Sequence, residues 1–191
     1  MFTLVTGGSA SGKSEYAEQL VTGLSGTRIY LATMEIWDEE CRRRVEKHRA
    51  ARAGRGFVTV ERPYDLMSLD FPGEIPEDAN VLLEDLGNLL ANERYREWEP
   101  VEENHSEEVS ANRSEKSLAS VAADRILRGI RYLSAHSRHL TIVTNEVFSG
   151  GDRYDPETLA YMRDLAWINR KLAAEADRVV EVVCGLPNIL K

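Results

Sequence analysis

The sequence predicts an α/β protein, a single domain over residues 1–191 built on a mostly parallel sheet flanked by helices. Short apolar runs alternate with amphipathic helical segments, with no internal repeat and no linker between them. The first apolar run leads directly into a glycine-rich loop and then a helix-forming segment. A chain of 191 residues with 42% hydrophobic and 29% charged residues suits one well-buried core.

The strands are predicted by short runs rich in apolar and β-branched residues, several of them continuous as in a buried parallel strand. Each run is bounded by glycine, proline or polar residues. In chain order, the expected strands span 2–6, 28–34, 57–61, 81–86, 140–144 and 178–183.

The helices are predicted by apolar residues at helical spacing, with capping residues or glycines at several ends. In chain order, they span 14–24, 39–52, 87–98, 115–135 and 157–176. Two stretches fit neither pattern. Residues 63–76 form a turn-rich connection, and 99–114 form a polar surface excursion in which apolar residues nearly vanish.

The most specific motif is a phosphate-binding loop with the spacing G-x-x-x-x-G-K-[ST]. It lies between a strand and a helix, as this motif requires. Its backbone N–H groups and the helix N-terminus favour phosphate, Lys13 can reach the β- and γ-phosphates, and the Ser14 hydroxyl can ligate Mg²⁺. The loop consists of Gly7, Gly8, Ser9, Ala10, Ser11, Gly12, Lys13 and Ser14.

Charge and cysteine content exclude other classes. A net charge of −8 argues against a general nucleic-acid or anionic-membrane binder. The two cysteines, Cys41 and Cys184, lie far apart and form no metal or redox spacing, which favours a reduced, cytoplasmic protein. No apolar run approaches the roughly 20 residues of a membrane span.

Two carboxylates end the apolar run at 81–86. Glu84 or Asp85 can hold the Mg²⁺ that Ser14 contacts, directly or through water, as a Walker-B acid does. Adjacent strand residues point to opposite faces, so the side chain that faces the loop is the candidate. The alternative is that both are ordinary polar residues at a strand end.

The expected helix at 39–52 is strongly basic in an acidic chain. On that helix His48 shares a face with Cys41, Val45 and Arg52. Arginines there can offset triphosphate charge, and a histidine can attack an α-phosphorus to carry a nucleotidyl group as a phosphoramidate. From composition alone, a histidine on a helix is more often packed or solvated than catalytic, and a run of arginines is more often a solvated face.

The order of motifs resembles the adenosylcobinamide kinase/adenosylcobinamide-phosphate guanylyltransferase family. The opening stretch from Val5 to Ser14, with Tyr16-Ala17-Glu18 behind it, is similar to the start of that family. The similarity covers nearly the whole length apart from 99–114. The later matching stretches are Tyr30-Leu31-Ala32-Thr33, Asp38-Glu39-Glu40, Arg44-Val45, His48-Arg49, Val81-Leu82-Leu83-Glu84, Asn92, Val143-Thr144-Asn145-Glu146-Val147, Arg163-Asp164, Asn169, Leu172-Ala173, Gly185-Leu186-Pro187 and Lys191.

The resemblance implies a RecA-like sheet and a bifunctional enzyme of cobalamin biosynthesis. Such an enzyme phosphorylates the corrinoid adenosylcobinamide with ATP or GTP, then transfers GMP from GTP to that phosphate through a guanylylated histidine, here His48, and releases pyrophosphate. It also implies a small cyclic homo-oligomer, a trimer. The sequence departs from the family pattern at 148–156 and 163–169. Outside the phosphate loop, the nucleotide-binding residues we expect are Thr33, Arg49, Glu61 and Glu84.

Two other functions remain open from the sequence. A simple small-molecule kinase would use the loop, Mg²⁺ and an acidic base, and would release no pyrophosphate. A GTP-sensing module would bind nucleotide without turnover and signal through the loop at 148–156. The basic helix argues against a simple kinase, and the presence of Lys13, Ser14 and Glu84 argues against a GTP-sensing module without turnover.

Overall fold

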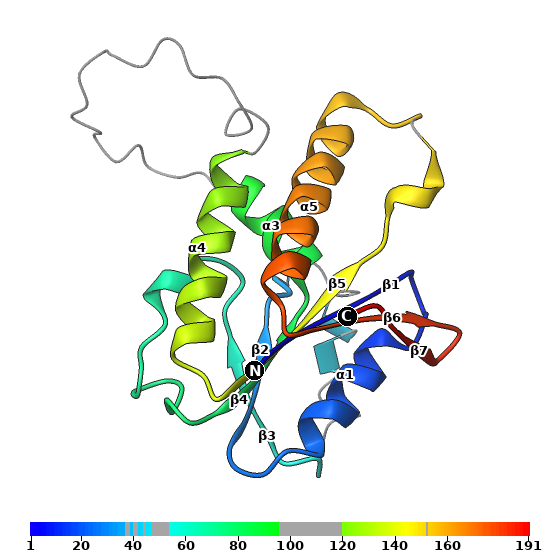
Figure 1. Ribbon diagram of the computed structural model, residues 1–191. Helices are drawn as coiled ribbons and strands as arrows, with labels where there is room; N and C mark the ends of the chain where they lie inside the picture. Colours follow the sequence, from blue (N-terminus) through cyan, green and yellow to red (C-terminus); the bar gives the residue numbers. More distant parts are fainter. Residues whose placement is uncertain (37–38, 40–41, 44, 47–53, 96–119, 152) are drawn as a thin grey trace, which may run out of the picture.

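The computed structural model describes residues 1–36, 39, 42–43, 45–46, 54–95, 120–151 and 153–191 (Figure 1). The predicted basic helix at 39–52 lies mostly outside these residues, and His48 and Arg49 lie outside them entirely. The predicted polar excursion at 99–114 is also outside the described part of the chain.

The described chain forms one seven-stranded sheet in the order β3-β2-β4-β5-β1-β6-β7. Neighbouring strands are parallel throughout, except that β7 runs antiparallel to β6. This confirms the predicted α/β class with a mostly parallel sheet. The strands are β1 (Phe2–Gly7), β2 (Arg28–Ala32), β3 (Phe57–Glu61), β4 (Asn80–Glu84), β5 (His139–Asn145), β6 (Arg178–Val183) and β7 (Leu186–Ile189).

The described helices lie on both faces of the sheet. Figure 1 shows α1 (Lys13–Thr22) on one face and α3 (Leu86–Tyr95), α4 (Val121–Ala135) and α5 (Pro156–Glu175) on the other. The described connections contain the short 3₁₀ turns Leu66–Ser68 and Phe148–Gly150.

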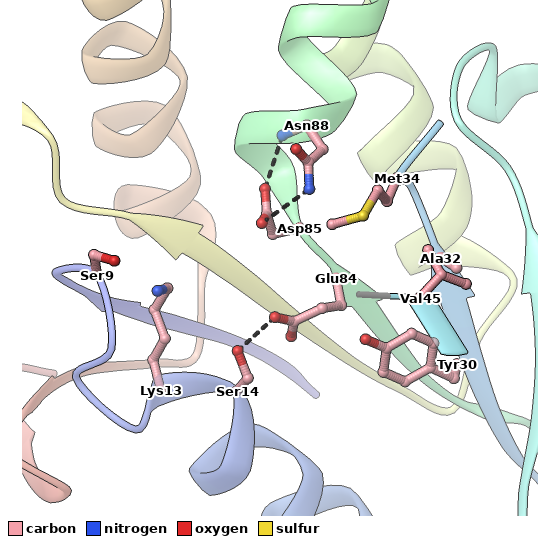
Figure 2. Close-up of a pocket in the computed structure, with 10 residues that line it drawn as sticks. All are labelled: Ser9, Lys13, Ser14, Tyr30, Ala32, Met34, Val45, Glu84, Asp85 and Asn88. Carbon is pink, nitrogen blue, oxygen red and sulfur yellow. Dashed lines mark hydrogen bonds between the residues drawn. The ribbon is translucent and has the colours of Figure 1, made fainter. Parts of the chain in front are cut away.

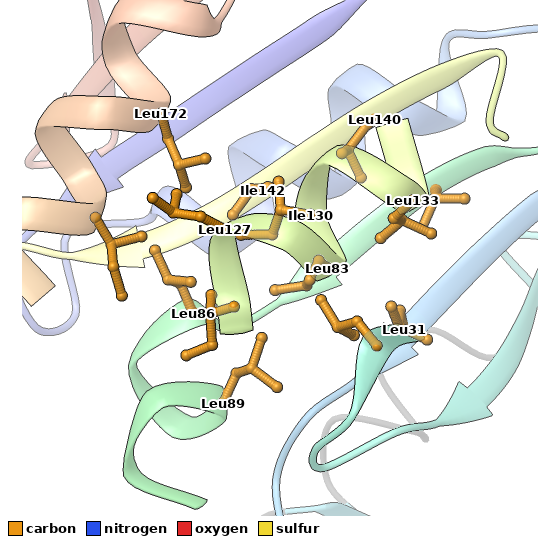
Figure 3. Packing of buried hydrophobic residues seen from close by; sticks show 14 of the residues in the cluster. Leu31, Leu83, Leu86, Leu89, Leu127, Ile130, Leu133, Leu140, Ile142 and Leu172 are labelled. Carbon is orange, nitrogen blue, oxygen red and sulfur yellow. The ribbon is translucent and has the colours of Figure 1, made fainter. Parts of the chain in front are cut away.

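The alternation of side chains along each strand divides the core into two clusters. In β4, Leu82 packs on the α1 side with Ala17 and Val21, whereas Leu83 packs on the side of the three helices. Leu83 lies with Leu86 and Ile130 in the larger cluster (Figure 3). Burying each such side chain stabilises the folded state by roughly 1.5–3 kcal/mol relative to leaving it exposed. The two clusters therefore hold the strands in place, and with them the strand ends that carry the site.

Helix α4 begins later than the sequence predicted. The expected start was at 115, but Ser120 has an extended backbone and its side-chain oxygen accepts a hydrogen bond from the N–H of Ala123 at 3.2 Å. This is the capping interaction that satisfies an otherwise unpaired N–H in the first turn. The helix therefore begins at Val121, and residues 115–119 lie outside the described chain.

Strand β7 was not predicted from the sequence. Its four residues are all exposed, and they include Pro187 and Asn188, which are poor strand formers. The strand exists because a two-residue turn at Cys184 and Gly185, both with positive φ, folds the chain back onto β6. Proline is tolerated there because β7 is the edge of the sheet.

Among the described residues, no helix has both the length and the apolar character needed to cross a membrane.

Candidate active site

The phosphate loop connects β1 to α1 and requires glycine at two points. A Cβ on Gly7 would lie 2.6 Å from the carbonyl oxygen of Val182 and 2.5 Å from the Ser11 hydroxyl, so no larger residue fits. Gly12 precedes α1 with φ of 90°, a conformation that other residues adopt only at a cost. As the N-cap residue, Gly12 has no side chain to cap the N-terminus of α1, so the first N–H groups of this helix can bind an anion.

Lys13 lies at the first position of α1 and is 8% exposed. Its Nζ donates a hydrogen bond to the carbonyl oxygen of Gly8 at 3.2 Å, across the loop. The ammonium group is therefore held over the concave side of the loop, where a phosphate chain would bind.

Ser14 and Glu84 bring α1 and β4 together. The Ser14 hydroxyl donates a hydrogen bond to Glu84 Oε1 at 2.6 Å, while Glu84 Oε2 is buried and has no hydrogen-bond partner among the described residues. Burial raises the pKa of Glu84 from 4.5 to about 7, and the hydrogen bond from Ser14 opposes this rise. An under-satisfied carboxylate oxygen beside the serine of a phosphate loop suits a hard cation such as Mg²⁺.

Asp85 faces a different element from Glu84. Its Oδ1 accepts a hydrogen bond from the N–H of Asn88 at 2.8 Å and its Oδ2 accepts one from Asn88 Nδ2 at 3.2 Å, so its carboxylate caps α3. Burial raises the pKa of Asp85, and hydrogen bonds from Asn88 and Asn145 oppose the rise. Of the two carboxylates left open by the sequence, Glu84 is the one in contact with the phosphate loop.

These groups line a cavity of about 310 Å³ at the carboxyl ends of β2 and β4 (Figure 2). One side of the cavity is polar and carries the loop residues and both carboxylates. The other side is apolar apart from the Tyr30 hydroxyl. The lining residues are Ser9, Lys13, Ser14, Glu84, Asp85 and Asn88 on the polar side and Tyr30, Ala32, Met34 and Val45 on the other.

Two residues outside the phosphate loop that were expected to bind nucleotide, Thr33 and Glu61, do not line this cavity. Thr33 is fully buried, and its hydroxyl donates to the carbonyl oxygen of Asp85 at 2.8 Å, so it braces the end of β4. Glu61 is exposed at the end of β3, the strand at the far edge of the sheet from β7. Arg49 and His48 lie outside the described residues.

Several lining residues were missed as site residues in the sequence. Asn88 stands three residues after Asp85, which is the spacing between an N-cap residue and the third residue of its helix. This spacing is a sequence signal by which Asn88 could have been predicted to contact Asp85. Tyr30 and Ala32 lie within an ordinary strand pattern, which does not separate lining the cavity from packing in the core. Met34 stands at the carboxyl end of that strand, where ligands of parallel sheets bind, and this position was the signal for it. Val45 lines the cavity although it was noted only as a neighbour of His48.

A phosphate loop after the first strand of a parallel sheet, with a carboxylate from β4 on its serine, defines a P-loop protein built to bind and react nucleoside triphosphates. The family model described as cobinamide kinase / cobinamide phosphate guanyltransferase matches residues 3–190. The chain belongs to this family, and it is a nucleoside-triphosphate-dependent kinase and guanylyltransferase of cobalamin biosynthesis.

Similar proteins come from several bacteria. The bifunctional adenosylcobalamin biosynthesis protein CobU of Escherichia coli K12 is 33% identical over 97% of both chains. CobU of Salmonella typhimurium is 32% identical, again over 97% of both chains. The bifunctional adenosylcobalamin biosynthesis protein CobP of Pseudomonas aeruginosa is 26% identical over 100% of this chain and 98% of its own length.

Proposed function

We propose that this chain phosphorylates adenosylcobinamide with ATP or GTP and then transfers GMP from GTP to the new phosphate through His48. In the second reaction, a ring nitrogen of His48 attacks the α-phosphorus of GTP, and the bond to the β-phosphate oxygen breaks to release pyrophosphate. An oxygen of adenosylcobinamide phosphate then attacks the phosphoramidate, and the P–N bond breaks to restore the imidazole. The product is adenosylcobinamide-GDP.

The phosphoryl-transfer step is supported by the phosphate loop. Lys13 and the uncapped N-terminus of α1 supply positive charge where the β- and γ-phosphates would bind. These groups hold the phosphate chain in place and stabilise the charge that develops on the transferred phosphoryl group.

Mg²⁺ fits the pair formed by Ser14 and Glu84. The free Oε2 of Glu84 and the Ser14 hydroxyl are the oxygen ligands that the ion prefers, and Asp85 stands next to them. Within the described residues, no group of three or more His, Cys, Asp or Glu side chains could hold a metal ion alone. The nucleotide phosphates would complete the coordination, and the bound ion would neutralise developing negative charge.

The observation that carries the role of His48 is the place of Val45. Val45 lines the cavity that contains Lys13, Ser14 and Glu84, and the sequence predicts Val45 and His48 on one helix face. A side chain three residues from a cavity-lining residue on a helix lies about one turn away on the same face. The imidazole is therefore expected within reach of a nucleotide bound at the phosphate loop.

The acceptor, the assembly and the location complete the proposal. A cavity of about 310 Å³ is at the small end for a ligand site, so the corrinoid macrocycle would lie at its mouth with only its reactive end inside. The enzyme would work as a cytoplasmic homo-oligomer, a trimer, as its family resemblance implies. Size-exclusion chromatography with light scattering tests the trimer, and a monomer mass would contradict it.

The test of the two activities is to assay them separately in His48→Ala. We expect phosphorylation of adenosylcobinamide to remain close to wild type and pyrophosphate release from GTP to be lost. His105→Ala, in the polar stretch, is the matched control and should retain both activities. If His48→Ala keeps both activities, the proposed role of His48 is wrong. If the wild-type protein phosphorylates adenosylcobinamide but transfers no GMP, the protein is a simple kinase.

A further inference from the structure

The turn between β6 and β7 contacts the backbone of the phosphate loop at Ser11 and Gly12. The N–H of Gly185 donates a hydrogen bond to the carbonyl oxygen of Ser11 at 2.8 Å. Beside this bond, the backbones of Gly12 and Gly185 approach so closely that a Cβ on Gly12 would lie 3.1 Å from the Cα of Gly185. Two segments more than 170 positions apart in sequence are thus packed backbone against backbone.

We propose that Gly185 is a positioning residue that holds the phosphate loop in its nucleotide-binding shape. In a planar trans peptide the C=O and the following N–H point in opposite directions. Fixing the Ser11 carbonyl to the turn therefore directs the N–H of Gly12 away from the turn, toward the phosphate side of the loop. This inference rests on the proposed binding of nucleotide at the loop.

The turn itself is held independently of the loop. Strand β6 pairs with β1, and β7 pairs with β6 in the register Val183 to Leu186. At the end of the chain, the N–H of Lys191 donates to the carbonyl oxygen of Val179 at 3.3 Å, and Lys191 Nζ donates to that of Ala174 at 3.0 Å. The strands of the hairpin are thus anchored by contacts outside the phosphate loop, and the turn at Cys184 and Gly185 is the part that meets the loop.

The left-handed backbone of Gly185 makes the contact possible. Its φ is 78°, and a Cβ built there meets no atom of the described residues within 4 Å, so Gly185→Ala adds backbone strain without a clash against them. The variant can relieve this strain by opening the turn, which moves the N–H away from Ser11. Binding of nucleotide must then close the turn again, so we expect the Kd for GTP to rise about 5- to 30-fold.

Gly26→Ala is the matched control. Gly26 also has a positive φ, 99°, and its added Cβ would make only an ordinary contact at 3.7 Å with Asn80. It lies between α1 and β2, away from the phosphate loop. Both variants should lose similar stability in urea, but Gly26→Ala should bind GTP like wild type. Gly185→Asn should restore much of the affinity, because asparagine tolerates the left-handed region.

The experiment measures the Kd for GTP with Mg²⁺ by calorimetry, and KM and kcat for phosphoryl transfer, on folded protein. The expected result is a raised Kd and KM with a smaller change in kcat for Gly185→Ala alone. Equal affinity in Gly185→Ala and Gly26→Ala would overturn the inference. A wild-type protein that binds no GTP would instead contradict the proposed function, so the two failures are distinguishable.

A second measurement does not depend on the variant folding. Because coupling between two sites is reciprocal, GTP should slow hydrogen exchange of the Gly185 amide in the wild-type protein. The amides of the Gly26 turn serve as the reference and should not change. No added protection at Gly185 in the GTP complex would also overturn the inference.

Discussion

Replacing Glu84 by glutamine should stabilise the nucleotide-free protein while lowering its activity. Burial raises the pKa of Glu84 from 4.5 to about 7, so the folded state holds a proton that the unfolded state has lost between these pH values. The stability of the protein therefore falls as pH rises from 4.5 through 7, because the folded state must then bury an ionised carboxylate.

The size of the effect follows from the same two pKa values. At 1.36 kcal/mol for each pKa unit, the ionised carboxylate costs the folded protein roughly 3 kcal/mol at pH 8. At pH 5 the cost is about 1 kcal/mol or less, since most of the folded protein still holds the proton. Glutamine keeps the size of the side chain and an acceptor for the Ser14 hydroxyl but carries no charge, so Glu84→Gln removes this cost.

The assay is urea unfolding of wild type and Glu84→Gln at pH 5 and pH 8 without nucleotide, followed by circular dichroism. We expect the variant to be more stable by roughly 2–3 kcal/mol at pH 8 and by about 1 kcal/mol or less at pH 5. Phosphoryl transfer should fall, since the ion would lose its charged ligand. Glu15→Gln, at an exposed position of α1, is the control and should show no such pH-dependent difference.

If Glu84→Gln is no more stable than wild type at pH 8, or differs from it equally at both pH values, then the buried carboxylate is not destabilised as described.

Two further predictions concern Lys13 and the contacts between helices. Lys13→Ala should lose roughly 1.5–3 kcal/mol of binding free energy for GTP in calorimetry, because one charge-assisted phosphate contact is removed. Asp164→Asn should lower the free energy of unfolding by about 3 kcal/mol in urea. The buried Asp164 carboxylate pairs with Arg94 and accepts a hydrogen bond from the N–H of Ser120 at 3.1 Å, so the variant leaves Arg94 uncompensated.

Two control variants test whether these losses are specific to Lys13 and Asp164. Lys171→Ala removes the same charge from α5 and should leave GTP affinity unchanged, so equal losses in both lysine variants would contradict the role of Lys13. Glu175→Gln breaks an ion pair with Arg131 in which both side chains are over a third exposed, and it should cost less than about 1 kcal/mol. A similar small cost in Asp164→Asn would contradict its buried role.

Much of the fold could be predicted from the sequence because burial leaves a clear pattern in a parallel sheet. Continuous apolar runs such as Val81 to Leu83 are what a strand covered on both faces requires. Strand β7 could not be found this way, because an exposed edge strand buries nothing and Leu186 is 72% exposed. The start of α4 was misplaced because periodicity does not mark the cap that Ser120 provides.

The site residues could be predicted where a local sequence motif determines their chemistry. They were harder to predict where tertiary packing determines which way a side chain points. The phosphate loop carries its own geometry, so Lys13 and Ser14 could be placed by motif. The choice between Glu84 and Asp85 depended on which side chain faces α1, and only the packed structure shows this. Thr33 stands at a strand end like the others, yet its buried hydroxyl bonds to the backbone, which no spacing reveals.

Guanylylation of His48 can be measured directly by incubating wild-type protein and His48→Ala with GTP labelled with ³²P at the α-phosphate. We expect wild type alone to carry the label, in a bond that acid breaks and alkali does not, as for a histidine phosphoramidate. Equal labelling of His48→Ala, or no labelled wild-type protein, would contradict the proposed role of His48.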